Sequence, residues 1–394
     1  MRNQDVEVII GHSGMGTGLH AASLYTPKSV SKDGNTIEIS VRGRWVRAPA
    51  LEINRQIFVI TGSWIKSATV HDEEWLETEL INPEACVNQL REQGSELRPD
   101  LFSFTQKVSA TVPRHTFPME WDSLAAIRIT TWQNWWEQLP RETRKNVRRS
   151  EKRGVKIACE DFSDELVGEI LQIQNECSVR QGRLYQHYGK SFDQVKRDHS
   201  GFAERSDFIC ARFENELIGF LKLVDRGDVA SIMQLNSQVA HYDKRPANAL
   251  LAKAVEICET KGISYLTYGR FNYGNKDDSG LRDFKIRNGF ENVLVPRYYV
   301  PLTPWGKICV KARLYRGLHQ ILPSSVIKAG VNIRAKWYSF RAIERTTLVE
   351  STQDAKRNSS GLPRSGRQTC NTSNRWSASN LTSQKSPTQP VGSK

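Results

Sequence analysis

The segment 206–262 constrains the fold most strongly. Three apolar-rich runs, DFICARF, ELIGFLKLVD and DVASIMQLNS, are separated by the hairpin-length connections Glu214-Asn215 and Arg226-Gly227. Pro246 then begins an amphipathic helical pattern that ends at Gly262. Three antiparallel strands followed by one long helix require a sheet with a helix packed on its face, so the chain is predicted to be α/β (α+β).

The flanking sequence extends this pattern in both directions. It predicts a mixed, mainly antiparallel sheet flanked by helices. In chain order the further elements are a strand at 123–130, a helix from 132 interrupted near Pro140 and stopped by Gly154, a strand at 155–161, a helix from Ser163 to about 183, a helix at 191–203, a strand at 263–269, a helix at 279–288 and a strand pair at 292–302.

The remaining sequence divides the chain into regions. Residues 36–70 alternate apolar and polar side chains, which predicts short antiparallel strands with turns at Arg42-Gly43 and Asn54-Arg55, and 82–94 has a helical pattern. The predicted regions are a poorly structured N-terminus (1–35), an N-terminal β-rich lobe (36–122), an α/β domain (123–303), a basic amphipathic helical extension (304–348) and a disordered tail (349–394).

Composition indicates a cytoplasmic protein. The chain is 38% hydrophobic and contains no apolar run of the roughly 18 residues that a membrane span needs. Its start lacks the pattern of a secretory signal. The 7 cysteines are scattered and never spaced as CxxC, so we expect reduced thiols and neither a zinc ribbon nor a disulfide framework.

The net charge of +13 is unevenly distributed. No acidic residue occurs between Thr303 and Arg341, where basic residues alternate with aromatic and aliphatic ones such as Trp305, Tyr315 and Trp337. This pattern fits peripheral contact with an anionic membrane at its cytoplasmic face. The alternative is a helical pair that packs on the domain and keeps its lysines in water.

Two other segments suggest a nucleotide site or a metal site, but neither is expected to form one. In GHSGMGTG, residues 11–18, a dinucleotide fingerprint needs glycine where Leu19 stands, and a P-loop needs lysine where Thr17 stands. The run from His71 to Glu74 could suggest a metal site, but acidic residues that open a helix are far commoner, and no metal is expected.

The predicted element order over about 132–303 resembles the GNAT acyltransferase superfamily. Within it, RETRKNVRRSEKRGVKI (141–157) and LRDFKIRNGFE (281–291) are similar to segments of the FemAB-like branch, whose members modify cell-wall or surface-polymer precursors. The resemblance implies an acyltransferase with acyl-CoA (acetyl-CoA) as co-substrate. Several FemAB-like relatives instead take an aminoacyl group from tRNA.

The resemblance places coenzyme A at the turn that precedes the long helix. There the family has Q/R-x-x-G-x-G/A, whose backbone N–H groups bind the pyrophosphate. This chain has Ala247 in place of the first glycine, and Pro246 removes one donor. The implied cofactor-binding residues are Lys244, Arg245, Ala247, Asn248 and Ala249; the alternative is a well-started helix without a ligand.

The catalytic residues are also implied by the resemblance. Many GNAT enzymes have a tyrosine four residues before a Gly-Phe pair, and here Lys285 precedes Gly289-Phe290, as in the FemAB-like branch. A lysine there could stabilise an oxyanion or protonate a leaving group, whereas the plain interpretation is a surface lysine. Tyr268, Gln234 and Asn236, on the two strands that would border the acyl group, complete the catalytic set.

Basic residues provide the candidate acceptor site. Arg144, Lys145 and Arg148 lie on a predicted helix with few acidic partners, and Arg270 ends a strand. We expect them to bind a phosphate-bearing or membrane-linked acceptor, with tRNA as the second choice; the alternative is a plain basic surface. The sequence thus predicts acyl transfer from acyl-CoA to an amine or hydroxyl of a cell-surface precursor. The alternatives are an aminoacyl-tRNA-dependent transferase and a non-catalytic GNAT-type binding module.

Overall fold

The computed structural model describes residues 36–316, apart from 42–43, 77, 81, 95–96, 181–182 and 273–279. The predicted terminal regions 1–35 and 349–394 therefore lie outside the described residues. So do the Arg42-Gly43 turn and most of the predicted extension 304–348. Within the described residues, no helix is long and apolar enough to cross a membrane.

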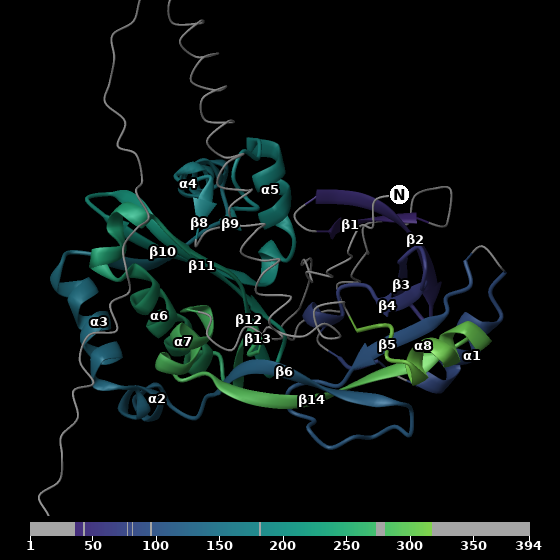
Figure 1. The fold of residues 1–394 in the computed structure, drawn as a ribbon. Helices are drawn as coiled ribbons and strands as arrows, with labels where there is room; N and C mark the ends of the chain where they lie inside the picture. Colours follow the sequence, from purple (N-terminus) through teal and green to yellow (C-terminus); the bar gives the residue numbers. More distant parts are fainter. Residues whose placement is uncertain are drawn as a thin grey trace, which may run out of the picture.

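One sheet of 12 strands runs through the whole described structure (Figure 1). Its order is β1-β2-β3-β4-β5-β14-β6-β13-β12-β11-β10-β7. The N-terminal strands are β1 (Thr36–Val41), β2 (Arg44–Ile53), β3 (Gln56–Thr61), β4 (Ser67–Val70) and β5 (Leu101–Thr105). The others are β6 (Met119–Arg128), β7 (Lys156–Glu160), β10 (Ser206–Phe213), β11 (Glu216–Asp225), β12 (Val229–Ser237), β13 (Tyr265–Arg270) and β14 (Glu291–Pro301).

The strand order is symmetric about the centre of the sheet. Counted inward from either edge, three antiparallel pairs are followed by one parallel pair, β4 with β5 and β12 with β13. Each inner parallel strand then pairs antiparallel with a strand from the other half, β5 with β14 and β13 with β6. The 36–122 lobe is therefore a smaller second copy of the same strand arrangement.

The helices that connect the parallel strands also correspond. Helices α1 (Pro83–Arg91) and α6 (Pro246–Thr260) each begin with a proline that follows a residue in left-handed conformation, Asn82 and Arg245 respectively. A proline suits this position because the first N–H groups of a helix have no intrahelical partner.

Two sequence-based boundaries are wrong. The boundary between residues 122 and 123 falls inside β6, a continuous strand. The predicted strand pair at 292–302 is a single strand, β14, which pairs with β6 through its first residues and with β5 through its last ones. Strand β6 follows β5 in the chain but pairs with β13, and β14 follows β13 but pairs with β5, so the two strands cross between the N-terminal and C-terminal parts of the sheet.

The helices cover both faces of the C-terminal half. Helices α4 (Asp164–Asn175) and α5 (Phe192–Ser200) pack on one face, and α2 (Trp132–Gln138), α3 (Arg141–Lys152), α6 and α7 (Gly280–Arg287) lie on the other (Figure 1). The break between α2 and α3 is at Pro140, as expected. Helix α4 ends well before the predicted residue 183, because the short hairpin β8 (Val179–Arg180) and β9 (Arg183–Leu184) follows it.

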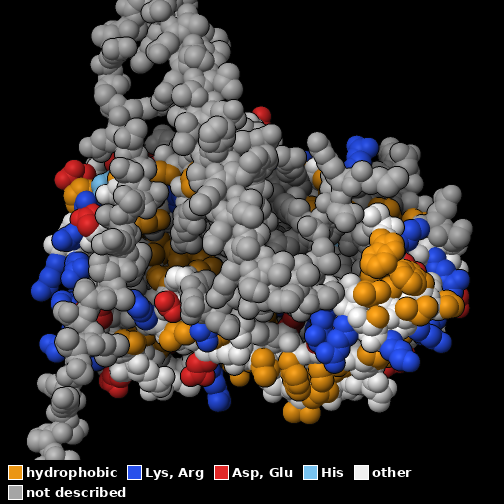
Figure 2. Space-filling view, in the orientation of Figure 1, with side chains coloured by type: hydrophobic (Ala, Val, Ile, Leu, Met, Phe, Trp, Pro, Cys, Tyr) orange, Lys and Arg blue, Asp and Glu red, His pale blue; other side chains and the backbone are white. Residues whose placement is uncertain are grey.

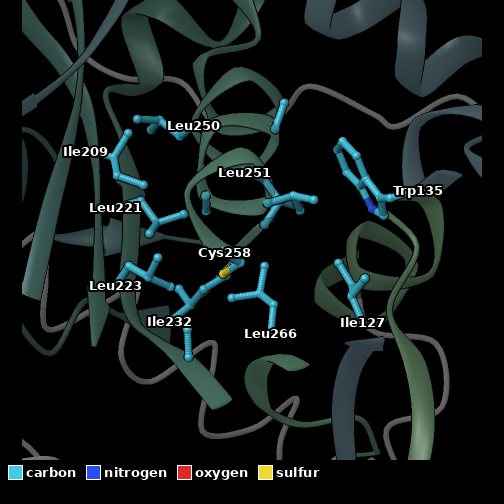
Figure 3. Close-up of a cluster of buried hydrophobic side chains, with 14 of the residues drawn as sticks. Ile127, Trp135, Ile209, Leu221, Leu223, Ile232, Leu250, Leu251, Cys258 and Leu266 are labelled. Carbon is cyan, nitrogen blue, oxygen red and sulfur yellow. The ribbon is translucent and has the colours of Figure 1, made fainter. Parts of the chain in front are cut away.

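The main core explains the sequence pattern of 206–260. Leu250, Leu251 and Cys258 on α6 are fully buried against Leu221 and Leu266 of the sheet (Figure 3). Strands β10 to β12 are buried on both faces, which is why they have nearly continuous apolar runs. A second core under α1 joins Phe58, Phe102 and Phe104 of the N-terminal lobe.

A glycine at the end of α7 gives a stability test. Gly289 has φ +85°, and an added Cβ would lie 2.9 Å from Nε1 of Trp135. We expect Gly289→Ala to lower the thermal unfolding midpoint, with strain of about 1–3 kcal/mol. Gly168→Ala is the matched control, because a Cβ there meets nothing within 4 Å; inside α4 it should stabilise by about 1 kcal/mol. Equal midpoints for the two variants would contradict the packing of Gly289 against Trp135.

Candidate active site

A gap opens in the sheet between β12 and β13. The two strands pair only through Val229↔Tyr265, Ala230↔Leu266 and Ser231↔Thr267. At the last of these pairs, the Ser231 and Thr267 hydroxyl oxygens lie 2.6 Å apart. Beyond this pair, β12 continues and pairs only with β11, and β13 continues and pairs only with β6. The backbone of β12 that faces the gap is thus not covered by β13.

Lys285, a residue of α7, lies against the part of β13 that borders this gap. Its side chain is fully buried, and Nζ donates hydrogen bonds to the carbonyl oxygens of Tyr268 at 2.5 Å and Arg270 at 2.7 Å. The same nitrogen lies 4.6 Å from the centre of the Tyr268 ring. The interpretation of Lys285 as a surface lysine is therefore wrong. Burial lowers its pKa to about 7, although the charge of Glu74 raises it.

The other three predicted catalytic residues border the same gap. Tyr268 is partly buried against Phe290, with ring centres 6.0 Å apart. On β12, Asn236 accepts a hydrogen bond of 3.0 Å from the hydroxyl of Tyr185, and Gln234 is paired with Lys222 of β11. Burial raises the pKa of Tyr185 to about 12, so this hydroxyl stays protonated at neutral pH.

Tyr185 was not found by sequence reasoning. It belongs to a short irregular segment after β9, and nothing in its local pattern distinguishes it. The Arg180 guanidinium stacks over the Tyr185 ring, 4.3 Å from its centre, and also donates to the carbonyl oxygen of Ile173. These contacts hold the Tyr185 hydroxyl beside β12.

Two backbone donors just before the predicted phosphate-binding residues are occupied by the protein itself. The carboxylate of Glu176 accepts hydrogen bonds from the backbone N–H groups of Val239 at 2.7 Å and Ala240 at 2.9 Å. Lys244 does not project outward: its ammonium lies 4.4 Å from the centre of the Phe213 ring. Carboxylate and phosphate oxygens seek the same donors, so Glu176 occupies part of what an anionic ligand would use.

The conformation of the turn also moves the position at which a glycine would be expected. Arg245 has φ 58°, the left-handed conformation that favours glycine, whereas Ala247 already lies inside α6. The glycine-preferring position of the turn is therefore 245, two residues before the one the sequence suggested. Asn248 uses its side chain to donate to Asn288 at 2.9 Å, and Ala249 is buried in the core.

The predicted acceptor residues are in two places. Lys145 and Arg148 are exposed on α3 and Arg144 is half-buried there, in a basic region at the left of Figure 2. Arg270 lies at the gap, where its guanidinium is 4.0 Å from the carboxylate of Asp122. None of the contacts between described residues joins α3 directly to Arg270. One contact joins α3 to α7, because Thr143 donates to the carbonyl oxygen of Arg287 at 2.8 Å.

A partly buried charge network lies next to Arg270, between the two lobes. Arg297 of β14 contacts the carboxylates of Asp122 and Glu73. Glu73 also accepts a 2.7 Å hydrogen bond from the N–H of Thr105. Burial raises the pKa of Asp122, but Arg297 and Arg270 outweigh this and lower it.

The adjacent Glu74 has the opposite shift. Burial raises its pKa against the attraction of Arg226, Arg297 and Arg270. Sequence reasoning took Glu73 and Glu74 for residues that merely open a helix. They do begin a short 3-10 helix, Glu73–Trp75, but its acidic side chains enter the space between the lobes. Among the described residues, no three His, Cys, Asp or Glu side chains come together to hold a metal.

Comparison with known proteins fits this geometry. No protein-family model and no curated protein matches the sequence. The structure is similar to the crystal structure of FemX, with a TM-score of 0.50 and 10% identity, covering 71% of this chain and 92% of that chain. The fold, a mixed and mainly antiparallel sheet flanked by helices, is therefore similar to that of FemX. At this identity the similarity concerns the fold alone.

Two further solved structures have lower TM-scores. The structure of L-PGS from Bacillus licheniformis gives 0.44 with 12% identity over 68% of this chain and 90% of that chain. A tandem GNAT protein from the clavulanic acid biosynthesis pathway gives 0.36 with 10% identity over 63% and 79%.

The buried amine of Lys285 gives a prediction for stability. Its pKa of about 7 in the folded protein lies below the ordinary 10.5, so the unfolded chain binds the extra proton between these values. Stability contributed by this site should therefore rise with pH from about 7 to 10.5. We expect the stability difference between the native protein and Lys285→Met, measured by denaturant unfolding, to change in favour of the native protein across this window. A difference independent of pH would contradict the lowered pKa.

Proposed function

We propose that the protein is an acyltransferase that works in the gap between β12 and β13. The observation that carries this proposal is the separation of the two strands directly beside a buried lysine. Backbone N–H groups of β12 that face the gap can polarise the carbonyl of an activated acyl group. The gap also fixes the reacting groups close together, which is the main source of acceleration for direct transfer without a covalent intermediate.

The chemistry follows from the groups that border the gap. An amine or hydroxyl of the acceptor attacks the acyl carbon, the new C–N or C–O bond forms, and the bond to the donor sulfur or oxygen breaks. Lys285, with a pKa near neutrality, is suited to transfer a proton to the leaving group or to stabilise the oxyanion. Tyr268, Gln234 and Asn236 position the acyl group from the two strands.

We propose that Glu74 is the base that removes the proton from the attacking amine or hydroxyl of the acceptor. The charge of this carboxylate raises the pKa of Lys285, and the charge of Arg270 lowers the pKa of Glu74, so Glu74 lies in the neighbourhood of both. Its raised pKa makes it a better base than an ordinary surface carboxylate. Arg270, at the gap, would contact a phosphate of the acceptor, and the exposed basic side chains of α3 would hold a more distant part of it.

The donor proposed first is an acyl-CoA thioester, such as acetyl-CoA, held by Lys244, Arg245, Ala247, Asn248 and Ala249. The acceptor is an amine or hydroxyl of a phosphate-bearing, membrane-linked surface precursor. This arrangement requires the diphosphate of coenzyme A to bind beside Glu176 or to displace it from Val239 and Ala240.

One observation favours a second donor. Glu176 already holds the two backbone donors of Val239 and Ala240, just before the family pattern, and its negative charge lies next to the place where a diphosphate would bind. An aminoacyl ester on tRNA needs no diphosphate there, and the net charge of +13 and the exposed face of α3 suit an RNA backbone.

The role of Lys285 can be separated from its structural contacts by a matched pair of variants. Lys222 of β11 is also fully buried, donates to the carbonyl oxygens of His199 and Gly201, and has a pKa lowered by burial to about 7. It does not border the gap. We expect Lys285→Met to reduce kcat for acyl transfer by about 10²-fold or more, while Lys222→Met keeps most activity in the fraction that stays folded. Equal losses in the two variants would assign Lys285 a purely structural role.

The two donors are distinguished by Glu176→Gln. Loss of the carboxylate charge should tighten the binding of coenzyme A, because the diphosphate no longer meets a negative group at the turn. Binding of a charged tRNA that avoids the turn should change little. Calorimetric titration with coenzyme A and filter binding with aminoacyl-tRNA measure both. If coenzyme A binds neither the native protein nor this variant, the thioester donor is wrong.

A further inference from the structure

A second feature of the molecule lies away from the gap, at the outer end of the N-terminal lobe. Helix α8 (Pro304–Lys311) packs there on β14 and follows it directly in the chain (Figure 1). In the space-filling view, hydrophobic and basic side chains lie next to each other over this end of the molecule (Figure 2). The proposed acyl transfer uses none of these side chains.

Two tryptophans form the centre of this surface. Trp64, in the turn between β3 and β4, is 66% exposed and meets Trp305 of α8 edge to face, with ring centres 5.5 Å apart. The indole nitrogen of Trp305 donates to the carbonyl oxygen of Trp64 at 3.2 Å. Ile308, one turn further along α8, is 54% exposed. Large apolar side chains this exposed on a single surface commonly mark a contact site.

Helix α8, which carries Trp305 and Ile308, is held firmly. Gly306 and Cys309 are buried on its inner side, and a Cβ at Gly306 would lie only 2.0 Å from the carbonyl oxygen of Asp100. Close contact on the inner side fixes the outer side, so Trp305 and Ile308 cannot turn inward. The exposure of Ile308 and the partial exposure of Trp305 are therefore properties of the fold rather than of a loosely attached helix.

The charged side chains on α8 and directly after it are all basic. Lys307, Lys311 and Arg313 are exposed on α8 and directly after it. Asp100, the acid at the start of the helix, is engaged by the hydroxyl of Thr303 and the N–H of Lys66, each at 2.9 Å. The sequence then continues to Arg341 without an acidic residue.

We propose that Trp64, Trp305, Ile308, Lys307 and Lys311 form a docking surface for an anionic lipid bilayer. Indole rings favour the boundary between headgroups and acyl chains, and lysines beside them favour negatively charged headgroups. An RNA partner would need open ring faces for base stacking, whereas Trp64 and Trp305 pack against each other and the third apolar group is aliphatic. This inference does not depend on the proposed transferase activity.

The apolar part is tested by co-sedimentation of the full chain with vesicles. Vesicles of phosphatidylcholine with phosphatidylglycerol are compared with vesicles of phosphatidylcholine alone. We expect the double variant Trp64→Ser, Ile308→Ser to lower partitioning onto the anionic vesicles roughly tenfold or more. Tyr188→Ser is the control, because Tyr188 is 47% exposed in the C-terminal half, outside the docking surface; it should bind as the native protein does.

The charged part has its own matched pair. Lys307→Gln with Lys311→Gln should weaken binding to anionic vesicles by roughly fivefold per lysine, with no effect on neutral vesicles. Lys145→Gln with Lys152→Gln removes the same charge from α3 and should leave binding almost unchanged. Unchanged thermal midpoints confirm that each variant is folded, and Ile308→Ser alone replaces the double variant if Trp64→Ser destabilises the lobe.

Three results would overturn the proposal. The first is absence of binding to anionic vesicles by the native chain. The second is an equal loss of binding in the α3 and α8 charge variants, which would indicate attraction by net charge alone. The third is a loss of single-stranded RNA binding in the α8 variants while vesicle binding stays unchanged, which would assign the surface to nucleic acid. None of these results depends on transferase turnover.

Discussion

The antiparallel pairing of β6 with β14 is the interaction on which the rest of the structure depends. These two strands lie at the centre of the sheet, where β6 follows β5 in the chain but pairs with β13, and β14 follows β13 but pairs with β5. Arg297, on β14, adds a buried contact with Asp122 of β6 and with Glu73 of the N-terminal lobe. Removal of either carboxylate would leave a buried charge with one partner fewer, which is more costly than the loss of an exposed ion pair.

The candidate site is a consequence of this central pairing. Strand β13 is held by β6 on one side, while on the other its parallel pairing with β12 stops after three residues. The gap therefore lies one strand away from the β6–β14 pair at the junction of the lobes. Lys285 comes from the helix that precedes β14, and Glu74 from the segment that follows β4.

Local sequence patterns predicted the elements with strong periodicity. Strands β10 to β12 and helix α6 were identified because their apolar runs and their proline and glycine boundaries are clear. Weak signals failed: β8 and β9 have two residues each, so the helix from Ser163 was extended too far. The crossing of β6 and β14 could not be found, because pairing between distant strands leaves no periodic mark in either.

The site was predictable only in part, for the same reason. Lys285 was identified by its position before Gly289-Phe290, but its burial depends on the carbonyl groups of β13, 15 and 17 residues earlier. The contact between Glu176 and Val239 joins residues 63 positions apart, and the contact between Trp64 and Trp305 joins residues 241 apart. No local pattern reports such pairs. The contacts of Glu176 and the contact between Trp64 and Trp305 therefore could not be predicted from the sequence.

The exchange of β6 and β14 also constrains how the chain can acquire its structure during synthesis. The ribosome releases the N-terminal strands long before residues 291–301, yet β5 needs β14 to complete its hydrogen bonding. Until then β5 has an open edge that can pair with other chains, a recognised route to aggregation. The sheet of the N-terminal lobe thus stays incomplete until residues 291–301 have left the ribosome.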